Sequence, residues 1–193
     1  MSREDHILKK IWHELNLGLN QGKHPFHIFA VATMNHNSMP DVRNVVLRNV
    51  DEKSNSISFH TDKRSKKISQ IKNNNDACAL FYDHEKKIQL RLYGKIFSND
   101  DINIRQEKWN RSKKMSKLCY LNKYPPGKKI ASSKKYLPDD KDLQNLENGI
   151  ENFSIINIDI KSIDWLSLNH KGHERMIIDF LENSKVNFRW VAP

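Results

Sequence analysis

The sequence contains few of the residues on which several common functional sites depend. Its 193 residues include only two cysteines, Cys78 and Cys119, which are too few for a disulfide framework or a thiolate zinc site. The six glycines form neither the GxGxxG turn of dinucleotide-binding folds nor a P-loop, and no GxSxG nucleophile elbow occurs. These absences argue against dinucleotide binding by a glycine-rich turn and against a serine hydrolase built on that elbow.

Long apolar runs are absent as well. No stretch approaches the roughly 18 apolar residues that a membrane-spanning helix needs. The N-terminal sequence MSREDHILKKIWHEL alternates charged and apolar residues and lacks the apolar centre of a signal peptide. The sequence therefore predicts a soluble, cytoplasmic protein with no membrane partner.

Positive charge is what the sequence has in excess. Its 33 lysines and arginines outnumber 23 acidic residues, which gives a formal net charge of +10. This charge suits nucleic acid, a membrane surface or a phosphorylated small molecule, although ordinary solvated lysines would give the same count. Basic residues are densest over 108–135, but no nucleic-acid motif or aromatic stacking platform accompanies them, so a nucleic-acid partner is not expected.

Hydrophobic periodicity predicts a chain made mostly of strands. Apolar positions at helical spacing over 3–20, followed by Gly22, predict an N-terminal helix within 1–22. A basic helix is expected over 62–76, weaker helical character over 99–118, and an irregular insertion over 122–150. Strands are expected at 26–34, 41–50, 57–61, 77–83, 87–97, 153–168, 175–181 and 186–193. Because strands mostly follow strands, the expected fold is mainly β, an antiparallel barrel with peripheral helices in a single domain, 1–193.

Two basic clusters lie at the ends of predicted strands. The segment RNVVLR contains Arg43 and Arg48, which an unbroken strand would point to opposite faces, whereas a bulge or strand end could bring both to one ligand. In HTDKRSKK, Ser65 can cap a helix whose free N–H groups, together with Lys66 and Lys67, would form a phosphate seat. Ordinary solvated side chains are the alternative for each cluster.

Two further polar features lie later in the chain. Gln89 is on the polar face of an alternating strand, and its amide can both donate and accept, as the edge of a flavin or a base requires. In NHKGHERM, His170 and His173 lie three residues apart, but no HExxH motif or third ligand accompanies them, so no metal is expected. Lys171, His173 and Arg175 alternate, so on a strand they would share one face suited to a phosphate or carboxylate.

The order of these clusters resembles the pyridoxine/pyridoxamine 5′-phosphate oxidase family, whose fold is an FMN-binding split barrel. RNVVLR is similar to the family's RxVLLK, FHTDKRSKK to FYTNxxSRK, and IQLRLYG to RQVRVEG. Trp165 and the downstream KGHER have the spacing of the family's Trp and RLHDR, and the terminal RWVAP is similar to RLAP. The resemblance covers most of 26–98 and 153–193, and it implies an antiparallel split β-barrel.

This resemblance also implies a homodimer with FMN at the subunit interface and a phosphorylated small-molecule substrate. Trp165 and Arg175 would reach FMN from the partner subunit, and Lys171 and His173 would be the catalytic residues facing the substrate. The other implied cofactor-binding residues are Arg43, Asn44, Val45, Val46, Leu47, Arg48, His60, Thr61, Ser65, Lys66, Lys67 and Gln89. The implied substrate-binding residues are Arg48, Trp109, Lys113, Ser116, Lys171 and His173.

The implied activity is that of an FMN-dependent oxidase. Hydride would pass from C4′ of pyridoxine or pyridoxamine 5′-phosphate to flavin N5, with oxygen as the acceptor, giving pyridoxal 5′-phosphate and peroxide. Two alternatives stay open: a split-barrel flavoprotein that acts on a different small molecule, as flavin reductases do, and a non-enzymatic binder of flavin or nucleic acid.

Several positions depart from the family pattern. Arg48 stands in place of a lysine, and Lys66 and Lys171 stand in place of arginines. The nearest counterpart of the family's SxQS segment is Ser132 and Ser133. The substrate-binding pattern is least intact around 109–135, so the sequence supports FMN binding better than it supports a vitamin B6 substrate.

Overall fold

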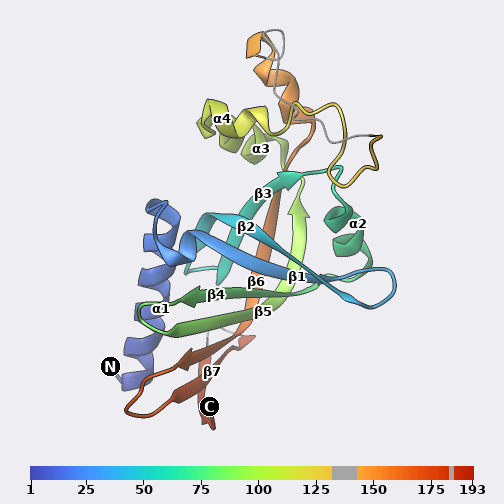
Figure 1. Cartoon of the computed structure of the whole chain (residues 1–193). Helices are drawn as coiled ribbons and strands as arrows, with labels where there is room; N and C mark the ends of the chain where they lie inside the picture. The colour runs from blue at the N-terminus through green and yellow to red at the C-terminus, as the bar shows by residue number, and fades with distance from the viewer. Residues whose placement is uncertain (132–142, 183–184) are drawn as a thin grey trace.

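The computed structural model describes residues 1–131, 143–182 and 185–193 (Figure 1). Its centre is one antiparallel sheet with the strand order β3-β2-β1-β4-β5-β6-β7-β8. Strand β3 also pairs with β6, so β1 to β6 close into a barrel that β7 and β8 extend. The strands are β1 (Ile28–Met34), β2 (Pro40–Asp51), β3 (Ser56–Asp62), β4 (Asp76–Asp83), β5 (Ile88–Asn99), β6 (Phe153–Ser167), β7 (Glu174–Phe180) and β8 (Val186–Val191).

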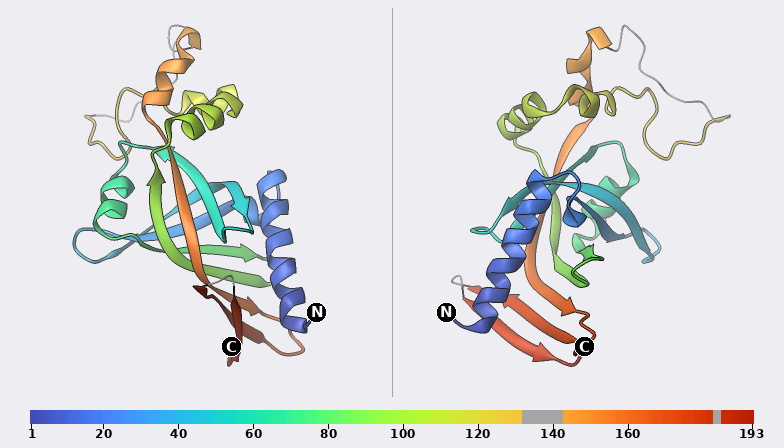
Figure 2. Two further views of the ribbon diagram at one scale, coloured as in Figure 1. Left: turned by 180° about the vertical axis from the view of Figure 1, so that it is seen from behind. Right: turned by 60° about the vertical axis from the view of Figure 1, so that its left-hand side comes forward.

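Helix α1 (Arg3–Asn20) lies along one side of the barrel (Figure 2). It begins at a capping box in which Ser2 and Asp5 satisfy each other's backbone N–H groups. Its apolar stripe, which includes Trp12 and Leu15, is buried in the main core. A Cβ at Gly18 would lie 2.8 Å from atoms of Phe26, so only glycine allows this close approach of α1 to the following 3-10 helix η1 (Pro25–His27).

The remaining helices lie at the other end and at the edge of the barrel (Figure 1). Helix α2 (Lys66–Asn73) connects β3 to β4. Helices α3 (Ile102–Arg111) and α4 (Lys114–Leu118) and the 3-10 helix η2 (Leu146–Glu151) cover the end where β6 begins. They enclose a second, smaller core of Trp109, Phe153 and Ile155, with Tyr120 and Ile150 packed against it.

The mainly β, antiparallel barrel expected from the sequence is confirmed, and every predicted strand is present. The weak helical signal over 99–118 corresponds to two helices, and η2 falls within the stretch expected to be irregular. Strand β7 begins at Glu174, with a turn before it in which Gly172 has a φ of 136°. None of the described helices has both the length and the apolar character needed to cross a bilayer.

Candidate functional site

Arg43 is held on the α2 side of the sheet by a polar network. Its Nη1 donates to Thr33 Oγ1 at 2.6 Å, and its Nη2 donates to Gln70 Oε1 at 3.0 Å and lies 2.8 Å from Asp41 Oδ2. Gln70 also donates to Asp41 at 2.7 Å. Thr33 and Gln70 are buried, so the guanidinium is fixed from two elements, β1 and α2.

Lys67 lies close to Arg43 and is anchored just as firmly. Its Nζ donates to Thr61 Oγ1 at 2.8 Å and to Ser65 Oγ at 3.1 Å. Burial, and then the positive charge of Arg43, lower the pKa of Lys67, while Asp62 and Asp41 oppose this shift. We call Arg43, Thr61, Ser65 and Lys67 the α2 seat, because it lies at the N-terminus of α2, where backbone N–H groups lack intrahelical acceptors. Lys66 is exposed beside it.

Strand β2 has a bulge at Arg48. The register between β2 and β3 shifts between Leu47 and Asn49, so Arg48 is the extra residue. Arg48 is exposed and meets different neighbours from Arg43: burial, and then the charges of Arg48 and Lys108, lower the pKa of His60 to about 3. The bulge therefore does not bring the two arginines to the same neighbours. Between them, Asn44 is exposed, Val45 and Val46 are half-buried, and Leu47 is fully buried in the core.

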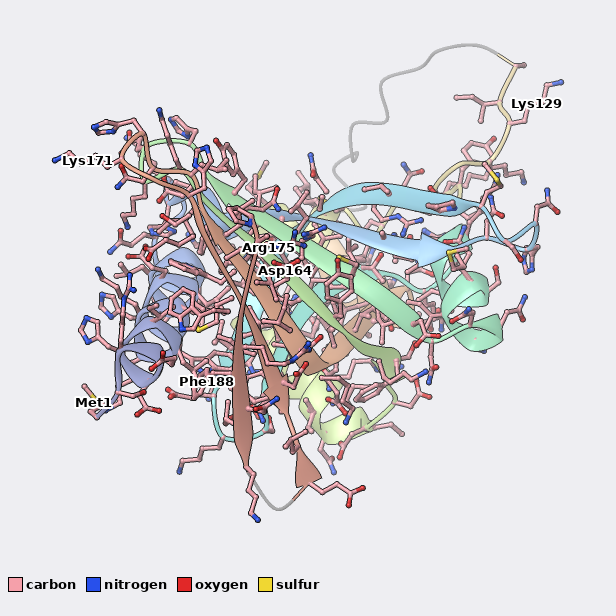
Figure 3. All side chains as sticks on the ribbon, turned by 90° about the horizontal axis from the view of Figure 1, so that it is seen from below. Met1, Lys129, Asp164, Lys171, Arg175 and Phe188 are labelled. Atoms are coloured by element: carbon pink, nitrogen blue, oxygen red, sulfur yellow. The ribbon has the colours of Figure 1, made fainter. Side chains whose placement is uncertain are left out.

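A second polar cluster lies on the opposite face of the sheet, which we call the outer sheet face. Gln89, Leu166 and Arg175 are in register across β5, β6 and β7. Arg175 Nε and Nη2 donate to Asp164 Oδ1 and Oδ2 at 3.0 and 2.7 Å (Figure 3). Arg91 Nη2 donates to the same Asp164 Oδ2 at 2.5 Å. The Asp164 carboxylate raises the pKa of Arg175, so this guanidinium is cationic at any physiological pH.

The outer sheet face is also rich in exposed apolar side chains. Along β1, β2, β4 and β5 they alternate with core residues, as strand geometry requires. The exposed members are Ile28, Val42, Leu80, Tyr82 and Tyr93, with exposed fractions between 38% and 59%.

One prediction for the hairpin between β6 and β7 is wrong. Lys171 and His173 do not share a strand face with Arg175, because they lie in the exposed turn before β7, and Lys171 is far from Arg175 at the tip (Figure 3). Trp165 faces the core side of β6, whereas Arg175 faces the outer side. Trp165 is 8% exposed, and its ring centroid is 6.4 Å from that of Trp190. Within one chain, Trp165 and Arg175 therefore lie on opposite faces of the sheet.

The predicted substrate-binding residues of the 109–116 segment are scattered. Trp109 is completely buried in the smaller core, where its indole donates to Glu147 Oε2 at 2.7 Å, so a direct contact of Trp109 with substrate is ruled out. Lys113 is exposed at the start of α4, and Ser116 is half-buried. The proposed counterparts of the SxQS segment, Ser132 and Ser133, lie outside the described residues.

Several polar residues of these clusters, Asp41, Gln70 and Asp164 among them, were not predicted. Asp41 lies two residues before Arg43 on the same strand, so strand periodicity could have placed them on one face. Gln70 and Asp164 meet their arginines only through tertiary contacts, and nothing in the sequence marks them. Within the described ranges, no group of three or more His, Cys, Asp or Glu side chains is arranged to hold a metal ion.

Sequence comparison finds relatives among the pyridoxamine 5′-phosphate oxidases. Residues 9–100 match the sequence model of the family described as pyridoxamine 5′-phosphate oxidase, FMN-binding domain. Pyridoxine/pyridoxamine 5′-phosphate oxidase 2 of Arabidopsis thaliana is 25% identical over 193 residues, and 94% of each chain is covered. Pyridoxine/pyridoxamine 5′-phosphate oxidase of a Psychrobacter species is 32% identical over 100 residues, which are 52% of this chain and 45% of that protein.

Solved structures agree on the fold. A pyridoxamine 5′-phosphate oxidase-related, FMN-binding protein of Nostoc punctiforme superposes with a TM-score of 0.74 at 21% identity, over 96% of each chain. PhzG of Burkholderia lata, in complex with tetrahydrophenazine-1-carboxylic acid, has a TM-score of 0.70 at 15% identity, over 100% of this chain and 94% of that one. The chain thus has the split-barrel fold, and its residues 9–100 match the FMN-binding domain of the pyridoxamine 5′-phosphate oxidase family.

Proposed function

We propose that this protein is an FMN-dependent oxidoreductase of the pyridoxine/pyridoxamine 5′-phosphate oxidase type. The observation that carries the proposal is the α2 seat. Arg43 and Lys67 are close enough for the charge of one to lower the pKa of the other, and both are fixed by hydrogen bonds. Two anchored cations beside two hydroxyls and a helix N-terminus form a donor set that fits the phosphate of FMN.

The remaining polar groups suit the other parts of the cofactor. Gln89 offers an amide that matches the alternating donors and acceptors of the flavin edge. His60 is neutral at physiological pH because of its low pKa, so its ring adds no charge beside the ligand. When bound, FMN would supply the redox chemistry, accepting hydride from the substrate and passing electrons to oxygen. The chain's own contribution is binding, orientation and exclusion of water.

Within one chain, the two polar clusters do not meet. Arg43 and Gln89 lie on opposite faces of the sheet, and β1 and β4 separate their strands, β2 and β5. A second copy of the chain, packed on the outer sheet face, would add Arg175 to a cofactor held by the first copy's α2 seat. The exposed apolar side chains of that face suit such an interface. We therefore propose a homodimer in which FMN lies between the subunits.

Lys171 and His173 would act within the same dimer. Their turn is exposed, so a role in catalysis requires it to lie over the flavin of the partner subunit. His173 would then be free to exchange a proton with the substrate, and Lys171 to bind an anionic group.

The test begins with the absorption spectrum of the purified protein and an FMN titration followed by quenching of flavin fluorescence. We expect a bound flavin with micromolar or tighter affinity, on the order of 1 µM. Peroxide release is then measured with pyridoxine 5′-phosphate and with pyridoxamine 5′-phosphate. A protein that takes up no FMN would overturn the proposal.

A second reaction within the same fold is favoured by the burial of Trp109. With this ring in the smaller core and Lys113 at the surface, the segment 109–116 does not form the expected phosphate-binding group. We therefore retain, as the alternative, a split-barrel flavoprotein that acts on a different small molecule. FMN binding without turnover of either B6 phosphate would favour this alternative.

A further inference from the structure

A single carboxylate is shared by two arginines on the outer sheet face. Asp164 of β6 accepts from Arg91 of β5 and from both Nε and Nη2 of Arg175 of β7. The Asp164 side chain is only 4% exposed, whereas the side chains of Arg91 and Arg175 are 31% and 29% exposed. The carboxylate is therefore covered by the two guanidinium groups, which themselves remain partly open to the surface.

The charges and donors of this cluster do not balance. Two guanidinium groups and one carboxylate leave a net charge of +1. Arg175 uses Nε and one N–H of Nη2, so both N–H groups of Nη1 have no acceptor in the described part of the chain. Arg91 Nε is buried and likewise has no hydrogen-bond partner among the described residues. Because buried or half-buried donors are costly when unmet, the cluster suits a ligand with acceptor oxygens.

We propose that Asp164 is a positioning residue for FMN. It holds Arg91 and Arg175 side by side as one preorganised donor group for acceptor oxygens of the cofactor bound by the partner subunit, an inference that rests on the function proposed above.

The geometry gives Asp164 this role through Arg175. An arginine side chain loses about 2 kcal/mol of rotamer entropy when it is ordered, and the bidentate contact with Asp164 removes much of that cost before the ligand arrives. The carboxylate also screens two like charges on strands that both pair with β6. Without it the two guanidinium groups would repel each other and turn outward.

The experiment compares FMN dissociation constants of purified Asp164→Asn, Arg175→Ala and the double variant with that of the parent protein. We expect Asp164→Asn to weaken FMN binding about tenfold or more, the effect of one misplaced charged hydrogen bond. The double variant should lose clearly less affinity than the sum of the two single losses in free energy, because Asp164 acts largely through Arg175. Fully additive losses, or a folded Asp164→Asn protein with parental affinity, would overturn the inference.

Loss of a buried carboxylate can also unfold the protein, so a charge-balanced variant is needed. Arg91→Gln combined with Asp164→Asn removes one charge of each sign and keeps the net charge at +1 while releasing Arg175. We expect this folded variant also to bind FMN about tenfold more weakly, and parental affinity would again refute the positioning role.

The matched control is Asp179→Asn. Asp179 pairs with Arg189 across β7 and β8, with Nε and Nη2 at 3.1 and 2.9 Å from the same oxygen. Among the described residues, the hydrogen bonds of Arg175 go to Asp164 and not to this pair. We expect Asp179→Asn to leave the FMN affinity unchanged. If it lowered the affinity as much as Asp164→Asn does, general destabilisation would explain the effects of both variants. A parent protein that binds no FMN overturns the proposed function, whereas normal FMN binding by Asp164→Asn overturns only this inference.

Discussion

At the scale of the residue, Lys67 illustrates how a binding group is prepared before its ligand arrives. Its ammonium is already held by Thr61 and Ser65, and burial lowers its pKa. A surface lysine must give up hydration and rotamer freedom to bind a phosphate, whereas Lys67 has largely done so on folding. The folded state therefore contains a desolvated, ordered ammonium group, and an anion bound in the α2 seat would stabilise it.

Replacement of Lys67 by methionine tests this view. We expect the FMN dissociation constant to rise about tenfold to a hundredfold, because one charge-assisted hydrogen bond is lost. The control is Lys72→Met, in the last turn of the same helix, where the side chain is exposed and should not affect affinity. Equal FMN affinities of the two variants, measured by fluorescence titration, would contradict a role for Lys67 in the seat.

His60 makes a prediction about stability and pH. The folded pKa of about 3 lies below the usual value of 6.5, so between these values the unfolded chain binds a proton that the folded chain does not. The contribution of neutral His60 to the free energy of unfolding is therefore complete above about pH 6.5. It is lost as the pH falls from about 6.5 toward about 3. This single group contributes a slope of at most about 1.4 kcal/mol per pH unit.

The variant His60→Gln should reduce the slope of the free energy of unfolding against pH on the acid side. Urea unfolding between about pH 4 and pH 7 measures the free energy of unfolding at each pH. The exposed His170→Gln substitution serves as the control and should leave the slope as it is. An unchanged slope in His60→Gln would show that other groups cause the acid sensitivity.

At the scale of the element, the pairing of β5 with β6 organises the barrel. The two strands are in register over most of their length, with one irregularity between Tyr93 and Gly94. At that irregularity the backbones approach so closely that a Cβ on Gly94 would lie 2.0 Å from the carbonyl oxygen of Asp159. The extra residue of this bulge is Lys161 of β6, and the missing side chain of Gly94 permits the close approach of β5 to β6 there.

We expect Gly94→Ala to lower the free energy of unfolding by about 3 kcal/mol or more, because the clash is with backbone and cannot be relieved by a side-chain rotation. Gly22→Ala is the control, since its new Cβ would have only His27 Nε2 at 4.0 Å as a neighbour. Denaturant unfolding of both variants gives the comparison. A Gly94→Ala protein as stable as the parent would mean that the β5–β6 bulge adapts without strain.

At the scale of the whole molecule, the two faces of the sheet have different surroundings. The inner face is covered by α1 and the barrel itself (Figure 1), whereas the outer sheet face leaves Leu80, Tyr82 and Tyr93 exposed. Leu80 and Tyr82 pair with Arg91 and Gln89, next to the Asp164 cluster. Exposed apolar side chains on neighbouring strands are typical of protein–protein interfaces. The proposed dimer would cover them and bring the separated halves of the cofactor site together.

The variant Leu80→Arg should therefore lower both the molecular mass in solution and the affinity for FMN. A charged side chain buried at the dimer interface costs several kcal/mol, on the order of a thousandfold in dissociation constant. Met115→Arg, on the exposed surface of α4, is the control. Sedimentation equilibrium measures the mass, and a parent protein that is monomeric while binding FMN fully would contradict the dimer.

Much of the fold could be predicted because the pattern of strands is local. Alternation over 87–97 and the apolar run 26–34 identify strands without any knowledge of their partners. The turn before Glu174 was misread because Lys171, His173 and Arg175 alternate as strand residues do, while Gly172 ends the regular geometry there. Periodicity detects which residues alternate, but it does not detect where hydrogen bonding between strands stops.

The sequence by itself determined the strands, the N-terminal helix and the basic segments that lie next to each other along the chain, because these depend on local spacing. Only the tertiary structure decided that Arg43 and Lys67 share a seat, that Trp109 and Trp165 are buried, and that Asp164 joins two arginines. Those outcomes depend on strand order and register, which bring residues such as Arg91, Asp164 and Arg175 together from distant positions in the chain. A charged residue can bind a ligand only when the fold has placed suitable side chains around it.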